Sequence, residues 1–132
     1  MIADNYGRII NIVSTSVRQP IDGLGVSNVT RGAMASWAKT LSKELASSGI
    51  TVNNILPGTT STERIDEILN YRAKANSTNF ETEKNRMINE IPFGRFATPE
   101  EIGGVIAFVA SPAASYITGT SIPVDGGKIK SI

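Results

Sequence analysis

The residues of this chain that could do chemistry stand after two apolar runs, where predicted strands end. Ser14 follows the β-branched run 8–13, and the turn Pro57-Gly58-Thr59-Thr60 follows the run 50–56. In a parallel sheet ligands bind beyond the carboxyl ends of the strands. A hydroxyl there can hold a substrate oxygen, and a glycine lets a ligand approach the backbone closely. The alternative interpretations are an ordinary turn serine and a turn that only terminates a strand.

The composition excludes several kinds of active site. The 132 residues contain no cysteine and no histidine, which excludes disulfides, thiolate zinc sites, cysteine nucleophiles and Ser-His-Asp triads. We therefore expect no metal site. The 13 Lys and Arg residues against 12 Asp and Glu give a net charge of +1, which argues against a nucleic-acid partner. Neither a membrane-length apolar run nor a signal-peptide pattern is present, so we expect a cytoplasmic protein with no membrane partner.

Three strands are expected to position these residues, at about 8–13, 50–56 and 120–124. Each is a short apolar run without the clean alternation of a half-exposed strand, which is typical of strands covered on both faces. Pro123 cannot donate to a strand ladder, so we expect the last strand to lie at an edge of the sheet or to be interrupted.

The strongest predicted helix covers residues 28–47 and ends at Gly49, which supplies a left-handed stop. Its apolar residues recur mainly every four positions and are expected to be buried: Val29, Ala33, Trp37, Leu41 and Leu45, with Met34 and Ala38 widening the stripe. For Trp37 we expect packing in the core or against another subunit.

Three further helices are predicted from their capping patterns and periodicity. One covers residues 63–75, and a second opens with a capping box at Thr78-Asn79-Phe80-Glu81 and runs to about Glu90. In a third, Thr98 caps the helix, Pro99 takes the first helical position and Glu101 reaches back to the cap.

The order strand, helix, strand, helices, strand predicts an α/β protein with a parallel sheet. Three strands are few for a doubly wound sheet, and the glycines never form the G-x-G-x-x-G turn that cradles a pyrophosphate. We therefore predict a single partial Rossmann-like domain over residues 1–132. It corresponds to the C-terminal half of a doubly wound parallel sheet whose N-terminal βαβ half is missing.

Several segments carry a resemblance to a known family. They are Gly7 to Ser14, Gly49 to Gly58, Ile91-Pro92-Phe93-Gly94-Arg95, Thr98-Pro99-Glu100-Glu101-Ile102, Tyr116-Ile117-Thr118-Gly119 and Val124-Asp125-Gly126-Gly127. In this order and spacing they resemble the C-terminal half of the short-chain dehydrogenase/reductase family. Such enzymes transfer a hydride between NAD or NADP and a carbonyl or alcohol substrate.

The resemblance implies roles for particular residues. Ser14 matches the family's substrate-binding serine, and Ser27, 13 residues later, stands where the family has its acid/base tyrosine. Arg31, four residues further, stands where the family has a lysine that binds the nicotinamide ribose. Ser16 is the alternative to Ser14, and Tyr71, the one tyrosine on a segment that could fold over the site, is the alternative to the missing tyrosine. The implied cofactor-binding residues are Arg31, Pro57, Gly58, Thr60 and Thr62.

Because Ser27 and Arg31 stand where the family has tyrosine and lysine, the proton-transfer chemistry of the site remains open. Ser27 and Arg31 share a helix face, but a serine hydroxyl is far less acidic than a tyrosine phenol, and arginine does not deprotonate in proteins. Ser27 is alternatively a helix N-cap, Arg31 a solvated helix residue, and Thr60 and Thr62 loop or capping residues. An active oxidoreductase, an impaired pseudoenzyme, and a structural fragment remain open. The fragment would need a complementary N-terminal half or self-exchange to fold.

The resemblance also implies a substrate lid and an assembly. Residues 60–90 correspond to the family's mobile helical lid, and the helix over 28–47 corresponds to a surface through which family members commonly pair. We therefore expect a homo-oligomer, or a complex with a complementary N-terminal half, that acts on a small carbonyl or alcohol.

Overall fold

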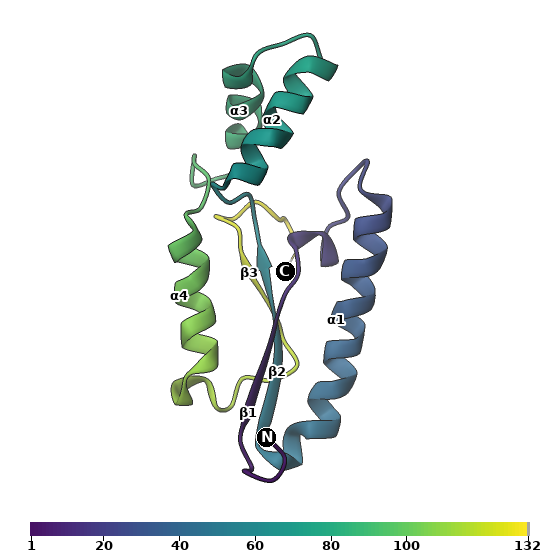
Figure 1. Ribbon diagram of the computed structural model, residues 1–132, viewed down its shortest axis with the longest axis vertical. Coiled ribbons are helices and arrows are strands. Elements are labelled where there is room, and N and C mark those ends of the chain that lie inside the picture. The colour runs from purple at the N-terminus through teal and green to yellow at the C-terminus, as the bar shows by residue number, and fades with distance from the viewer. Residues whose placement is uncertain (132) are drawn as a thin grey trace.

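The parallel sheet of this chain confirms the predicted fold class. The computed structural model describes residues 1–131. Strands β1 (Gly7–Ile12), β2 (Ile50–Pro57) and β3 (Ser121–Val124) form one parallel sheet in the order β1-β2-β3 (Figure 1). β3 pairs only with β2 and is therefore an edge strand, as Pro123 predicts. β1 forms the other edge.

Two long helices flank this sheet, and a helical hairpin stands beyond its carboxyl end (Figure 1). α1 (Gly25–Leu45) and α4 (Pro99–Ala110) are the flanking helices, and α2 (Glu63–Ala75) with α3 (Phe80–Asn89) form the hairpin. Short 3₁₀ turns follow β1 (η1, Thr15–Val17), α1 (η2, Ala46–Ser48) and α4 (η3, Pro112–Ala114). In the described residues, no helix is both long and apolar enough to cross a membrane.

The two helix–sheet contacts differ in chemistry. α4 packs Ile102 and Val109 against Ile55 of β2, which makes an apolar core. α1 instead places Ala38 and Ser42 in its buried face. Small residues in that face let the helix lie close to the sheet.

The predicted apolar stripe of α1 is wrong for most of its members. Val29 is 72% exposed and Trp37 is 51% exposed, whereas Leu41 and Leu45 are partly buried and Ala38 is buried. Ala33 and Met34 are also exposed. A four-residue spacing drifts around a helix of 3.6 residues per turn, so the predicted row winds away from the sheet. Trp37 is therefore not a core residue of this chain.

The helix ends agree with the sequence in part. The capping box of Thr98 and Glu101 is present, with Pro99 in the first turn, and Gly49 adopts the left-handed conformation with φ 66°. The capping box predicted at Thr78 is wrong, because Asn79 caps α3 by accepting from the Thr82 N–H. The Thr78 hydroxyl instead donates to Glu83.

A row of polar side chains crosses all three strands at one level. The Asn11 amide donates to Asn54 Oδ1 over 3.0 Å, and the Asn54 amide donates to Ser121 Oγ over 3.1 Å. These residues are also backbone partners in the register of the sheet.

Candidate functional site

Ser14 lies where β1 ends, partly buried, as the sequence predicts. Its Oγ accepts a hydrogen bond from the Ser16 backbone N–H over 3.1 Å and so caps η1. Since that bond uses a lone pair, the hydroxyl proton of Ser14 is left to donate to a ligand oxygen. The Ser16 hydroxyl is buried and has no hydrogen-bond partner among the described residues. A ligand atom or a water molecule could satisfy it.

Arg31 reaches the same end of β1 from α1. Its Nη1 donates to the Ile12 carbonyl oxygen over 3.2 Å, two residues before Ser14. A guanidinium has five N–H donors, so this bond orients Arg31 and leaves donors for a ligand. Arg31 is exposed, so its role as a ribose ligand and its interpretation as a solvated helix residue both remain predictions.

Ser27 lies one helical turn before Arg31. It is the third residue of α1 and is partly buried. The N-cap position belongs to Leu24, so the alternative interpretation of Ser27 as an N-cap is wrong. The Ser27 backbone carbonyl accepts from the Thr30 hydroxyl.

The turn after β2 supplies the second group of predicted residues. Pro57 is the last residue of β2, and the Gly58 N–H donates to the Val124 carbonyl over 2.9 Å. A Cβ on Gly58 would lie 2.7 Å from the Asp125 Cα, so the segment after β3 itself requires glycine here. The contact of Gly58 with a nicotinamide remains a prediction.

Thr60 and Thr62 differ in how their hydroxyls are used. The Thr60 hydroxyl donates to the Gly58 carbonyl over 3.2 Å. Thr62 occupies the N-cap position of α2, yet its side chain makes no capping hydrogen bond. Its hydroxyl and the first N–H groups of α2 are therefore available to a ligand carbonyl or amide.

The three tyrosines lie on other elements than Ser27. The Tyr6 hydroxyl donates to the Ala110 carbonyl at the C-terminal end of α4, and Tyr116 is fully exposed before β3. Tyr71 lies on α2 and is also exposed. Its predicted role as a substitute acid remains a prediction.

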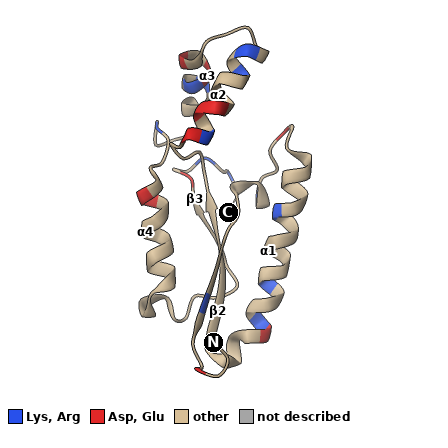
Figure 2. Cartoon of the chain, viewed as in Figure 1, with Lys and Arg blue, Asp and Glu red and all other residues tan. Residues whose placement is uncertain are grey.

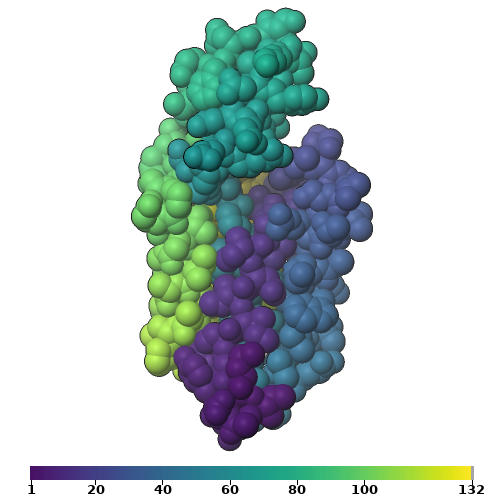
Figure 3. Space-filling model, viewed as in Figure 1, coloured from purple at the N-terminus to yellow at the C-terminus, as the bar shows by residue number. Residues whose placement is uncertain are grey.

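The hairpin of α2 and α3, which we call the lid, stands above the ends of the strands. Figure 3 shows a hollow between the lid and the N-terminal end of α1. Charged residues of both signs gather on the lid, whereas the sheet and the N-terminal half of α1 carry few (Figure 2). Among the residues described, no group of His, Cys, Asp and Glu could hold a metal ion.

The lid contains one buried carboxylate. Glu83 is 3% exposed, and its Oε1 accepts from Thr78 Oγ1 at 2.6 Å, Arg86 Nη1 at 2.7 Å and Asn76 Nδ2 at 3.2 Å. The hydrogen bond from Thr78 is the largest of the effects that lower the pKa of Glu83. This carboxylate joins the end of α2 to α3.

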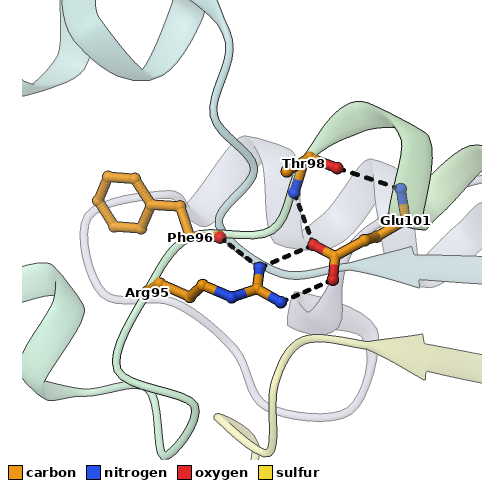
Figure 4. Close-up of polar contacts among 4 residues, drawn as sticks. All are labelled: Arg95, Phe96, Thr98 and Glu101. Carbon is orange, nitrogen blue, oxygen red and sulfur yellow. Dashed lines mark hydrogen bonds and ion pairs between the residues drawn. The ribbon is translucent and has the colours of Figure 1, made fainter.

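A second carboxylate lies at the base of the lid. Glu101 accepts two hydrogen bonds from the Arg95 guanidinium, at 2.7 and 2.8 Å, and one from the Thr98 N–H at 2.8 Å (Figure 4). The Arg95 hydrogen bonds are the main cause that lowers the pKa of Glu101 to about 2. The sequence analysis identified Glu101 as a capping residue but missed its pairing with Arg95, which comes from outside the helix.

These groups fit one part of a nicotinamide nucleotide. Arg31 offers donors for ribose hydroxyls, and Thr62 offers a hydroxyl beside a helix N-terminus for a carboxamide. The unpartnered Ser16 hydroxyl also lies at this end of β1. The chain contains no glycine-rich turn for the pyrophosphate, so the fit covers only the nicotinamide end.

A parallel sheet with polar groups at the carboxyl ends of its strands defines a Rossmann-like α/β protein. A family model described as Enoyl-(Acyl carrier protein) reductase matches residues 1–128. The chain belongs to the short-chain dehydrogenase/reductase family.

Comparison with known proteins shows how much of a family member is present. NADPH-dependent reductase BacG of Bacillus subtilis (strain 168) is 36% identical over 132 residues, which are 100% of this chain and 51% of that protein. The crystal structure of YwfH, an NADPH dependent reductase involved in bacilysin biosynthesis, is 34% identical with a TM-score of 0.93, covering 99% of this chain and 50% of that one.

A second similar structure was solved with ligands. L-sorbose reductase from Gluconobacter frateurii, complexed with NADPH and L-sorbose, is 32% identical with a TM-score of 0.92, covering 100% of this chain and 51% of that one. The chain thus spans about half the length of the relatives that it matches.

Proposed function

We propose that this chain is the substrate-site half of an NAD(P)-dependent oxidoreductase that transfers a hydride between the nicotinamide and a carbonyl or alcohol substrate. The observation that carries the proposal is the meeting of Arg31, from α1, with the end of β1 just before Ser14. The membership in an oxidoreductase family supports it. The bound nicotinamide would supply or accept the hydride.

Most of the predicted residues have a role in this proposal, and Ser27 is the exception. Ser14 donates a hydrogen bond to the substrate oxygen, and Arg31 binds the ribose hydroxyls with its remaining N–H groups. Thr62 holds the carboxamide, and Pro57, Gly58 and Thr60 shape the turn beneath it.

Binding of the cofactor tests the proposal directly. A fluorescence titration of the 132-residue chain with NADPH and with NADH is expected to saturate. Arg31→Ala should weaken this binding, whereas Arg64→Ala, which removes an exposed arginine from the lid, should not. Equal binding by both variants would contradict the role of Arg31. No saturation with a folded chain would mean that the chain alone builds no nicotinamide site.

A second candidate is a catalytically impaired relative, and the residues at positions 27 and 31 favour it. A serine and an arginine supply no efficient proton donor at neutral pH, because neither ionises readily. The double variant Ser27→Tyr with Arg31→Lys, made in the longest form of the protein that folds, should gain reductase activity if the site is impaired. No gain would favour proton transfer from the substrate or from water.

Uncovered apolar surface supports a partner. Val26, Val29 and Trp37 are exposed on α1, and Ile12 is 48% exposed on the open edge of β1. We propose that a complementary N-terminal half or a second copy of the chain covers them. Light scattering after size-exclusion chromatography should show a mass above that of one chain. A stable, cooperatively unfolding monomer would contradict this proposal.

A further inference from the structure

An open cleft lies between α3 and the start of α4. It has a volume of ≈ 570 Å³. Ser61 lines this cleft, whereas its neighbours Thr60 and Thr62, which belong to the candidate cofactor site, do not. Cavities of about 300–1,000 Å³ typically hold small organic ligands. The cleft is therefore a second candidate binding site, and its lining shares no residue with the site proposed for the nicotinamide.

Two apolar side chains form part of the cleft wall. Ile88 comes from α3 and Phe96 from the segment before α4, and both are partly buried. Phe96 also packs against the core of the lid, which consists of Ile65, Leu69 and Met87, so its ring is held in place. A ligand that covers Ile88 and Phe96 removes apolar surface from water, which favours binding. The wall therefore favours a ligand with an apolar body.

Lys84 adds a positive charge that no carboxylate of the chain balances. It is partly buried in the cleft wall, one helical turn before Ile88. Lys84 takes part in none of the ion pairs among residues 1–131. The adjacent carboxylate of Glu83 is already occupied by donors from the lid, among them Arg86. Solvent screens an ammonium beside an apolar wall less than one in open water, so Lys84 can attract a ligand anion.

The other two charged residues of the cleft neutralise each other. Arg95 and Glu101 both line it, and the Arg95 guanidinium donates two hydrogen bonds to the Glu101 carboxylate at 2.7 and 2.8 Å (Figure 4). A bidentate arginine–carboxylate pair is strong and geometrically specific. The Glu101 carboxylate is therefore compensated within the chain, and the charge of Lys84 is the one that a ligand can balance.

Hydroxyl groups supply further donors in the same cleft. The Thr98 Oγ accepts from the Glu101 backbone N–H over 3.4 Å, so its hydroxyl proton is left to donate to a ligand. Ser61 is held through its backbone, whose N–H donates to the Ala97 carbonyl over 2.8 Å, and this leaves its side chain available. The two oxygens of a carboxylate accept several hydrogen bonds at once. One ammonium and two hydroxyls beside an apolar wall therefore match a carboxylate on an apolar body.

We propose that this cleft binds a small monocarboxylate with an apolar body. The Lys84 ammonium pairs with the carboxylate, and the Ser61 and Thr98 hydroxyls lie in the same cleft as donors to it. The apolar body covers Ile88 and Phe96. A phosphate or a dicarboxylate fits less well, because the cleft has one uncompensated cation and an apolar wall. The inference goes beyond the proposed function and does not depend on it.

A titration with octanoate tests the proposal, and octanamide is the uncharged control ligand of the same length. Two-dimensional ¹H–¹⁵N NMR spectra of the 132-residue chain report which backbone amides respond and at what ligand concentration. Lys84→Gln is the test variant. Lys74→Gln is the matched control, because it removes the same charge from an exposed position on α2 that does not line the cleft. The spectra also show whether each variant is folded.

Octanoate should shift the amide signals of Lys84, Ile88 and Phe96 saturably. It should bind about tenfold more tightly than octanamide, because a hydrogen bond between charged groups is stronger than one between neutral groups. Lys84→Gln should remove most of this difference, and Lys74→Gln should retain it. Three outcomes would each overturn the proposal: shifts confined to amides outside the cleft, equal binding of octanoate and octanamide to the unchanged chain, and equal losses of affinity in the two variants.

Discussion

The sheet and the lid are stabilised in different ways. Strand pairing joins residues far apart in the sequence, such as Gly7 with Ile50, and α4 seals an apolar core over it. The lid joins neighbours in the sequence, and its small core depends on a buried carboxylate as well. The sheet therefore fixes where Ser14 lies and where Arg31 meets β1, whereas α2 and α3 of the lid pack chiefly against each other.

The same difference appears in the two carboxylates of the lid region. Glu83 is buried and binds three donors from the lid itself, so it stabilises the hairpin. Glu101 is partly exposed and binds Arg95, so it holds the segment before α4 against that helix. Measurements that separate local from global unfolding will sharpen this contrast.

The largest effect is expected from the core of the sheet. Ile55→Ala should lower the free energy of unfolding by about 2–5 kcal/mol, because it leaves a cavity at a fully buried position. Chemical denaturation followed by circular dichroism measures it. Ile2→Ala is the control, since Ile2 is 63% exposed and its substitution should change stability by less than about 0.5 kcal/mol. Equal effects would mean that the core is not centred on β2.

A smaller and local effect is expected from Glu83→Gln. The glutamine keeps the shape but weakens the charge-assisted hydrogen bond from Arg86, so exchange of the amides in α2 and α3 should rise about tenfold. Exchange in β2 should stay unchanged. Glu81→Gln, an exposed change in the first turn of α3, is the control. A uniform rise throughout the sheet and the lid would show that the two regions unfold together.

A smaller loss of stability is expected from removing the N-cap of α4. Thr98→Ala removes the side chain that accepts from the Glu101 N–H, and such losses cost about 1 kcal/mol. Thr98→Ser keeps the hydroxyl and should restore most of the stability. Thermal unfolding of the unchanged chain, Thr98→Ala and Thr98→Ser measures these differences in stability. A serine variant as unstable as the alanine variant would argue against a capping role.

The smallest effect is expected from mild acid. The pKa of Glu101 is lowered from 4.5 to about 2, so the ion pair favours the folded arrangement above pH 4.5 and its contribution fades only as the pH falls toward 2. The loss of stability caused by Arg95→Ala should therefore be the same at pH 7 and at about pH 5. Chemical denaturation at the two pH values measures this, and a difference between them would show that another group contributes.

The sequence predicts the elements of this chain better than their buried faces. The bounds of α2 agree with the prediction, and the edge position of β3 follows from one proline. Local signals suffice there, because capping and ladder geometry act over a few residues. The buried face of α1 was predicted from apolar spacing, but contact with the sheet selects Ala38 and Ser42 instead.

The candidate site was predictable in part. The strand ends placed Ser14 and the turn after Pro57 at one edge, and parallel topology alone explains this. The contact of Arg31 with the Ile12 carbonyl depends on the position of α1 along the direction of the strands, and no local sequence pattern determines that position. Arg95 was missed for the same reason, because its partner Glu101 lies across the start of a helix.

The amide row of Asn11, Asn54 and Ser121 has a consequence for alignment. Parallel strands have no tight turn between them that could set their register, so side-chain interactions that form in one register only help to fix it. The hydrogen bonds among these three side chains are of this kind, since a shift of one strand by one residue would turn its side chain to the opposite face of the sheet. The row thereby fixes the register that brings the ends of β1 and β2, and with them Ser14 and Pro57, to the same level of the sheet.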